Sequence, residues 1–208
     1  MENTYCRSIL LKNLNKLIQT NNVPQKWKKS VTKLIEKTNK PKINEFRPIS
    51  LTNNSYKICM GILRTKIENH ISKNNLTRDQ QFGFTKQRRT TDSIYALIYA
   101  INHSKKYNYN LIITAVDFKK AFDSINRNKL LETMQKHKLH PKAIDIIINI
   151  YKNEKTVLTK ENEFLDDIEI TSGIKQGCNS SGTLFLLITY LIIDELNKMK
   201  IGFKTKQL

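Results

Sequence analysis

The stretch Leu111-Ile-Ile-Thr-Ala-Val-Asp117-Phe118-Lys-Lys-Ala121-Phe122-Asp123 is the part of the sequence that decides the fold. Its apolar first half is typical of a β-strand, and we expect this strand to end on the carboxylate of Asp117. A carboxylate on a rigid strand offers an oxygen ligand to a hard cation, such as one that carries a triphosphate. Phe122 follows where a sugar could pack. Asp123 is also a candidate cap of the helix that follows.

Three further blocks of sequence accompany this stretch, and together the four occur in the order that a known family shows. In chain order, the four blocks are Phe46-Arg47-Pro48-Ile49-Ser50-Leu51, then Gln80-Gln-Phe82-Gly83-Phe84-Thr-Lys86-Gln-Arg88-Arg89-Thr-Thr91-Asp92-Ser-Ile94, then the stretch around Asp117 (the Asp117 block), and finally Ser172-Gly173-Ile-Lys175-Gln176-Gly177-Cys-Asn-Ser180-Ser181-Gly-Thr-Leu184-Phe185. The chain resembles the reverse transcriptases, or RNA-directed DNA polymerases, of non-LTR (LINE-type) retrotransposons over roughly residues 23 to 208. Group II intron maturases share much of this order, so the resemblance defines the polymerase class better than the host element.

The resemblance implies an α+β fold that comprises the fingers and a partial palm of a right-hand polymerase. This fold is helix-rich with a small antiparallel palm sheet, and the thumb is absent. We expect a helical extension over residues 1–22 and a reverse transcriptase domain over 23–208, with fingers at about 23–110 and the partial palm at 111–208.

The family places a second metal-binding element, a paired Asp-Asp in a tight hairpin, after the fourth block, and the sequence ends at Leu208 before one occurs. Asp166-Asp167 precedes the fourth block, and we expect it to form a polar turn between two short strands. Asp194-Glu195 is expected on a solvated helical face. Two-metal catalysis needs carboxylates that bridge ions about 3.5–4 Å apart. We therefore expect an incomplete catalytic set and an isolated chain that is inactive.

The resemblance also implies roles for individual residues around the nucleotide. Asp117 would be the catalytic residue that binds Mg²⁺ (or Mn²⁺), and the backbone carbonyl of Phe118 would offer a neighbouring oxygen. Phe122 matches the steric gate that favours dNTPs over rNTPs, although ordinary core packing is the alternative. Gln176 and Gly177 match the turn beneath the nucleotide and template base, where an amide both donates and accepts and glycine permits close approach. Gly177 as a simple turn residue is the alternative.

Basic residues of the first two blocks are candidates for phosphate contacts. Lys86 and Arg88 would bind the nucleotide triphosphate, since a guanidinium group binds phosphate oxygens in a bidentate way. Arg47 and Arg89 would contact the template or another nucleic-acid strand. A hydrogen-bond donor that stabilises the fold is an equal alternative for Arg47.

Three positions depart from the family pattern. Thr85 stands where the family often has Arg, and Gln87 where it has Gly before the second Arg. The usual Ser-Pro of the fourth block is Ser181-Gly182, which predicts a looser start of the helix that follows.

The overall charge agrees with a nucleic-acid partner. The 208 residues carry 36 Lys+Arg against 18 Asp+Glu, a formal charge of +18, which attracts a phosphate backbone through counterion release. An A/T-biased coding sequence would also enrich Lys, Asn and Ile throughout. Basic residues nevertheless concentrate around the proposed fingers, which favours RNA binding that weakens with salt.

Cysteine spacing and hydropathy bound the environment. Cys6, Cys59 and Cys178 are far apart without a CxxC pair, so neither a disulfide framework nor a zinc site is indicated. The longest apolar stretch, Leu184 to Ile193, is too short to span a bilayer, and no signal peptide opens the chain. We expect a soluble, intracellular protein without membrane contact.

Periodicity predicts the helices and strands. Residues 2–20 form an amphipathic pattern, while residues 30–37 fit a strand nearly as well as a helix. Helices are expected at 54–73, 90–106, 126–139, 141–153 and 181–200, and a strand pair at 156–159 and 168–171.

Three interpretations of the function remain open. In the first, the chain is part of a polymerase whose complete form copies an RNA template into DNA from a DNA primer and dNTPs. In the second, it is a non-catalytic RNA-binding protein derived from a reverse transcriptase. In the third, it is a decayed reading frame whose incomplete palm sheet exposes an edge and aggregates.

Overall fold

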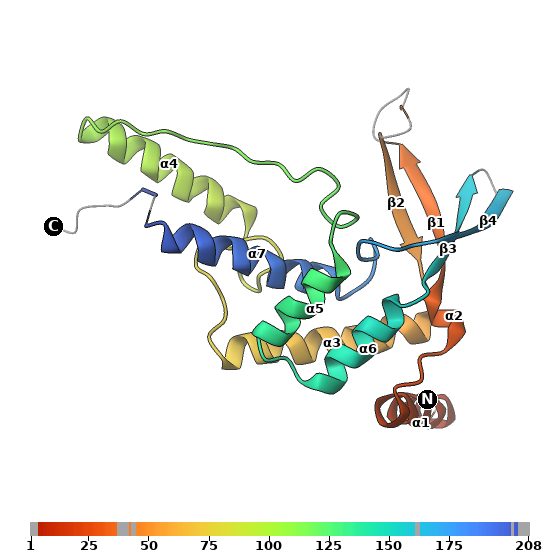
Figure 1. Cartoon of the computed structure of the whole chain (residues 1–208). Helices are drawn as coiled ribbons and strands as arrows, with labels where there is room; N and C mark the ends of the chain where they lie inside the picture. Colours follow the sequence, from red (N-terminus) through yellow and green to blue (C-terminus); the bar gives the residue numbers. More distant parts are fainter. Residues whose placement is uncertain (1–3, 37–41, 43–44, 161–162, 201, 204–208) are drawn as a thin grey trace.

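The computed structural model describes residues 4–36, 42, 45–160, 163–200 and 202–203, and places a four-stranded sheet beside a group of packed helices (Figure 1). The helices are α1 (Thr4–Thr20), α2 (Gln25–Lys28), α3 (Asn54–Lys73), α4 (Thr90–Lys106), α5 (Arg127–Lys136), α6 (Pro141–Tyr151) and α7 (Ser181–Lys198). The strands are β1 (Lys29–Glu36), β2 (Phe46–Leu51), β3 (Lys155–Lys160) and β4 (Glu163–Glu169). The architecture is therefore helix-rich α+β.

The sheet is mixed and has the order β2-β1-β3-β4. β1 pairs antiparallel with β2 and parallel with β3, and β3 pairs antiparallel with β4. The first block of the sequence is β2 itself, and its Pro48 is tolerated because β2 is an edge strand. This differs from the small antiparallel sheet that we expected, since the parallel β1–β3 pair joins segments about 125 residues apart.

Short hydroxyl side chains cover the buried face of the central strands. Ser30 and Thr32 of β1 and Thr156 of β3 are nearly inaccessible, and they bond to one another: Thr32 Oγ1 lies 2.7 Å and Ser30 Oγ 3.2 Å from Thr156 Oγ1. The alternation in β1 therefore buries polar residues and leaves Val31 and Ile35 more exposed. This reversal of the usual pattern explains why the sequence did not separate strand from helix here.

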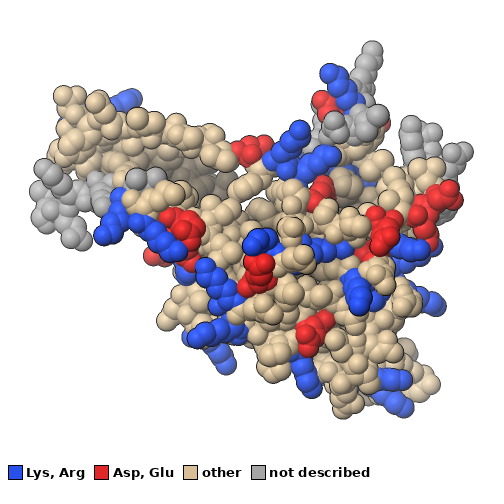
Figure 2. Space-filling model, in the orientation of Figure 1, with Lys and Arg blue, Asp and Glu red and all other residues tan. Residues whose placement is uncertain are grey.

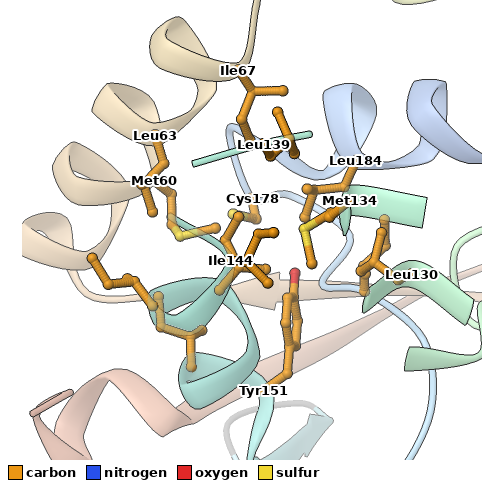
Figure 3. Packing of buried hydrophobic residues seen from close by; sticks show 14 of the residues in the cluster. Met60, Leu63, Ile67, Leu130, Met134, Leu139, Ile144, Tyr151, Cys178 and Leu184 are labelled. Carbon is orange, nitrogen blue, oxygen red and sulfur yellow. The ribbon is translucent and has the colours of Figure 1, made fainter. Parts of the chain in front are cut away.

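The core lies between four helices that are far apart in the sequence (Figure 3). α3 and α7 pack together, and α5 packs against both α6 and α7. The fully buried side chains include Tyr56, Met60 and Ile67 of α3, Leu130 and Met134 of α5, Ile147 and Ile150 of α6, and Leu184, Leu187 and Tyr190 of α7. Burial of each such side chain stabilises the folded state by about 1.5–3 kcal/mol relative to exposure. This group of helices therefore contributes most of the hydrophobic stabilisation of the molecule.

Helix positions agree closely with the sequence predictions. α3 and α4 have the predicted bounds, and α5, α6 and α7 end two or three residues early. Local caps explain this agreement: Asn53 accepts a hydrogen bond from the Ser55 backbone at the start of α3, and Pro141 begins α6. The α5 cap is Asn126, which accepts from the Asn128 and Lys129 backbones. Asp123 is thus not the cap of this helix.

The predicted strand at Leu111–Asp117 is wrong for the described structure. Residues 111–117 form neither helix nor strand, and no described strand pairs with them. Ile112 is 90% and Val116 79% exposed. A strand requires hydrogen bonds to a neighbour, and high β-propensity alone supplies none.

α4 lies at the end of the molecule opposite the sheet, and the segment that follows it runs back toward the sheet (Figure 1). Among the residues of α4, only Ser104 is buried, and the apolar side chains Ile94, Leu97 and Ile98 of this helix are about half exposed. We refer to α4 together with residues 111–117 as the arm.

Two acidic pairs differ from expectation. Asp166 and Asp167 lie within β4 rather than in a turn, and Asp167 forms an ion pair with Lys29 at 2.7 Å. Glu195 is solvated as predicted, but Asp194 is not: it receives two hydrogen bonds from Arg78, at 2.6 and 3.0 Å. This guanidinium lowers the pKa of Asp194 from its usual value, chiefly through the hydrogen bond.

Candidate functional site

The turn at Ser172–Gly177 packs directly on the end of the Asp117 block. Gly173 has φ +78°, and a Cβ there would stand 2.8 Å from the Asp123 Cα, so only glycine fits. The Gly173 N–H donates to the Ile125 carbonyl at 2.8 Å, and the Ile174 N–H to the Phe122 carbonyl at 3.0 Å. The third and fourth blocks are therefore joined through their backbones.

Gln176 joins three of the four blocks. Its side-chain Nε2 donates to the two carboxylate oxygens of Asp123, at 3.1 and 3.2 Å. Its carbonyl accepts from the Ser50 N–H of β2 at 2.9 Å. Gly177 has φ +97°, and a Cβ there would lie 3.1 Å from the Ser50 carbonyl oxygen, so glycine permits this approach. The predicted pair Gln176-Gly177 thus sits where the first, third and fourth blocks meet.

A buried network of charged side chains, Arg127, Glu154 and Lys175, packs against the turn at Ser172–Gly177. Arg127 donates to the carbonyls of Tyr151, Ile170 and Gly173 and to Glu154 Oε2, the last at 2.5 Å. Lys175 Nζ lies 3.4 Å from Glu154 Oε1 and donates to a backbone carbonyl, with its side chain 1% exposed.

Burial dominates the electrostatics of this network. Desolvation raises the pKa of Glu154, although Lys175 and Arg127 partly offset it. Desolvation likewise lowers the pKa of Lys175, against the attraction of Glu154. Charges held this far from water persist only when they are paired and hydrogen-bonded.

Four phenylalanines bring the second block to the same place. The Phe84 ring contacts Phe122 edge-on, with centroids 5.9 Å apart, and Phe185 at 6.3 Å. Phe122 also contacts Phe185 at 5.3 Å, and Phe118 contacts Phe185 at 6.1 Å. Phe122 is therefore a half-buried member of an aromatic cluster, while Phe118 remains half exposed.

The departure from Ser-Pro at the start of α7 has a steric cause. A Cβ on Gly182 would lie 2.5 Å from Phe84 Cδ1, which is far inside contact distance. Phe84 itself has φ +57°, a conformation that fixes where its ring can lie. Glycine at 182 is thus the residue that admits this ring.

A cavity of about 360 Å³ opens beside the junction. The hydroxyl face of the sheet lines it on one side and the turn on the other. Its lining includes Ser30, Ser50, Lys120, Asp123, Arg127 and Gln176. These side chains offer donors and acceptors suited to a polar ligand.

Asp117 is exposed at the end of the arm. Within the described part of the chain, no three acidic, His or Cys side chains gather as a metal-binding group. Asp123 is the nearest carboxylate in sequence, and it already accepts from Gln176. One free carboxylate and a backbone carbonyl do not fit a two-ion site, so the described residues supply at most a first ligand.

The candidate phosphate-binding residues are accessible. Arg47 lies exposed on β2, and Lys86 and Arg89 are exposed next to α4. Arg88 contacts Asp79 at 3.1 Å and stacks over the Phe82 ring. Because Asp79 is 97% exposed, this ion pair is weak and a phosphate can compete for Arg88. Figure 2 shows Lys and Arg spread over the face in view, whereas the outer part of α4 is largely uncharged.

Sequence reasoning missed the residues that hold the turn. No motif marks Arg127, Glu154 and Lys175 as partners, because their contacts span up to 148 residues of chain. Phe84 and Phe185 were within the recognised blocks, but their ring contacts had no local signal.

No helix that the structure describes is long and apolar enough to cross a membrane.

Comparison with known proteins identifies the family. Residues 35–205 match the family model described as reverse transcriptase (RNA-dependent DNA polymerase). The chain is 26% identical over 181 residues to the retrovirus-related Pol polyprotein from type-2 retrotransposable element R2DM of Drosophila melanogaster, covering 86% of this chain and 17% of that protein. It is 20% identical over 195 residues to the transposon TX1 149 kDa protein of Xenopus laevis, covering 93% and 15%.

A third relative is the probable RNA-directed DNA polymerase from transposon BS of Drosophila melanogaster, 21% identical over 178 residues, which cover 84% of this chain and 19% of that protein. The chain spans less than a fifth of the length of each of these relatives. The family match nevertheless covers most of the chain and includes all four blocks. The chain therefore belongs to the reverse transcriptase family, with relatives among the enzymes of non-LTR retrotransposons.

Proposed function

We propose that this chain forms the part of a retrotransposon reverse transcriptase that holds the template and the incoming nucleotide. The observation that carries the proposal is the junction at Gln176, where a backbone hydrogen bond from Ser50 and a side-chain hydrogen bond to Asp123 unite three of the four blocks. The Phe84 ring adds the second block through Phe122. Their convergence next to a polar cavity supports a binding site rather than four separate structural motifs.

Within this proposal, residues 23–110 act as fingers and residues 111–208 as a partial palm, preceded by the helical extension 1–22. Arg47 and Arg89 contact the template strand, and Lys86 and Arg88 contact the triphosphate. Their exposure and the net charge of +18 support these roles.

Phe122 is proposed to exclude a 2′-hydroxyl. Its ring is fixed on two sides by Phe84 and Phe185, which supports a rigid wall. The test is Phe122→Val in a polymerising version extended beyond Leu208, for which we expect relaxed discrimination against rNTPs. Unchanged dNTP preference would reduce Phe122 to a core residue.

Asp117 is proposed as a carboxylate ligand of the catalytic Mg²⁺ or Mn²⁺, with the Phe118 carbonyl beside it. When bound, the metal would polarise phosphoryl oxygens. The exposure of Asp117 supports its availability. A complete site needs carboxylates beyond those that the described residues gather, so we derive no catalytic step from this chain alone.

The first experiment measures RNA binding and primer extension by residues 1–208 and by Asp117→Ala, with an RNA template, a DNA primer, dNTPs and Mg²⁺ or Mn²⁺. We expect both proteins to bind RNA equally and the affinity to fall steeply with salt, since the phosphate contacts do not involve Asp117. Any extension should disappear in Asp117→Ala. Equal loss of binding and extension would contradict the role of Asp117, and no binding by folded protein would contradict the proposal.

A non-catalytic RNA-binding role is the second candidate. The donor set around Asp117, which falls short of a two-ion site, favours it. Salt-sensitive RNA binding without extension in a version that includes further carboxylates would support this candidate over the first.

A further inference from the structure

The side chains of Gln176 and Asp123 face each other, and their hydrogen-bonding chemistry determines which end of the Gln176 amide points toward Asp123. An ionised carboxylate only accepts hydrogen bonds, whereas a glutamine amide has one end that donates and one that accepts. Nε2 of Gln176 lies 3.1 and 3.2 Å from the two oxygens of Asp123. The reverse orientation would set Oε1 against two carboxylate oxygens, so the amide has one favourable orientation.

The backbone around this pair leaves little freedom for either side chain. Gly173 touches the Asp123 backbone, and its N–H donates to Ile125. On the other side, the carbonyl of Gln176 itself accepts from Ser50. Both residues are half-buried, so the hydrogen bonds are only partly exposed to competition from water.

The accepting end of the amide is left available. Among the residues that the structure describes, none donates a hydrogen bond to Gln176 Oε1. Asp123 and Gln176 both line the polar cavity. A ligand at the junction would therefore meet an acceptor rather than a donor.

We propose that Asp123 is a positioning residue that holds the Gln176 amide with Nε2 inward, so that Oε1 accepts a hydrogen bond from the bound nucleic acid. This inference rests on the proposed function and deepens it, because it assigns one polarity to a group that could otherwise present either. The matching group on the ligand is an O–H or N–H donor, either a sugar hydroxyl or the amino edge of a base.

The orientation is tested first without any ligand, by recording the side-chain amide signals of residues 1–208 by ¹⁵N NMR. Gln176→Ala identifies the signals by their loss. We expect Asp123→Ala to remove the downfield shift that a carboxylate imposes on the Gln176 amide protons, and Asp123→Asn to retain part of it, since its carbonyl still accepts. Ser124→Ala, a change at the exposed neighbour, should leave the signals in place. Unchanged Gln176 signals in Asp123→Ala would overturn the proposal.

The second arm measures the affinity of the same proteins for an oligoadenylate RNA and for its DNA counterpart. Asp123→Ala and Gln176→Ala should each weaken RNA binding by about tenfold, the equivalent of one hydrogen bond to a charged or oriented group. The double variant should be no weaker than either alone. A loss confined to RNA identifies a sugar hydroxyl as the donor, and an equal loss for DNA identifies the base edge.

The two arms separate this inference from the proposed function. Absence of RNA binding by the unaltered, folded chain would contradict the proposed function while the NMR result still decides the orientation. Losses that multiply in the double variant would overturn the positioning role, because they would show that the two residues act independently.

Discussion

The turn at Ser172–Gly177 and the arm both carry residues of the candidate site, yet they are held in opposite ways. The turn is fixed by one backbone hydrogen bond to Phe122 of the Asp117 block, one to Ile125 just after it and one to β2, and by a buried network of three charges. The arm, which ends at Asp117, has Ser104 as its only buried residue in α4 and leaves Ile112 almost fully exposed.

This difference separates the residues proposed to recognise the nucleotide from the residue proposed to bind the catalytic metal. The groups proposed to recognise the nucleotide are organised by contacts within the chain. The proposed metal ligand stands on a segment that the described residues hardly constrain. Preorganised groups lose little entropy on binding, whereas Asp117 would have to be ordered by additional contacts.

The largest expected effect is at the buried network beneath the turn. Glu154→Gln leaves Arg127 and Lys175 without their anionic partner, and we expect a loss of about 3–5 kcal/mol in the free energy of unfolding. Urea denaturation measures it. Glu195→Gln is the matched control, because its ion pair with Lys198 is exposed to solvent and its loss should leave the free energy of unfolding almost unchanged. Equal small effects at both positions would show that the buried network does not fix the turn.

Gly182→Ala tests the attachment of the second block to α7. The new methyl group displaces the Phe84 ring, for which we expect a cost of about 1–3 kcal/mol. The control is Gly61→Ala in α3, whose Cβ would meet only Asn179 Nδ2 at 3.6 Å and should stabilise the helix by about 0.5–1 kcal/mol. Thermal unfolding of both variants, and of Gly182→Ala with Phe84→Ala as rescue, checks the two signs. A stabilised Gly182→Ala variant would show that the ring contact does not attach the second block to α7.

Asp194→Asn weakens the link between the loop before α4 and α7. We expect a loss of about 1–2 kcal/mol at neutral pH, since a charged bidentate pair with Arg78 is replaced by a neutral contact. The folded pKa of Asp194 is lowered, so its contribution is fully present above the ordinary pKa of about 4 and is lost as pH falls through the lowered value. Stability measured from pH 6 to pH 2 should therefore fall less steeply in Asp194→Asn. Parallel profiles would contradict the pairing.

The smallest effect is expected on the arm itself. Leu97→Ser in α4 should change the free energy of unfolding by less than about 0.5 kcal/mol, because this side chain is 45% exposed. Leu187→Ala in α7 is the buried counterpart and should lose about 2–5 kcal/mol. A loss above about 2 kcal/mol in Leu97→Ser would show that the α4 surface is covered in solution, and sedimentation of the same samples would reveal a second copy.

The sequence predicted the elements whose signals are local. Apolar spacing and caps located the helices, and the order of four blocks indicated the family. The strand at 111–117 failed because a strand depends on a partner that its own residues do not specify. Asp123 was interpreted as a possible cap, although its side chain bonds to Gln176, 53 residues away. The site assignments themselves, Arg47, Lys86, Arg88, Arg89, Asp117 and their neighbours, stay predictions until they are tested by mutation.

The parallel pairing of β1 with β3 also sets the order in which the protein can fold during synthesis. Ser30 and its partner Thr156 are 126 residues apart. At about 5–20 residues per second, the ribosome needs roughly 6–25 s to make the second after the first. During that interval β1 can pair with β2 but presents its other edge unpaired, and such an edge is open to other chains. Until β3 has been synthesised, this edge of β1 can therefore pair with other chains, and slower translation lengthens the time for which it stays unpaired.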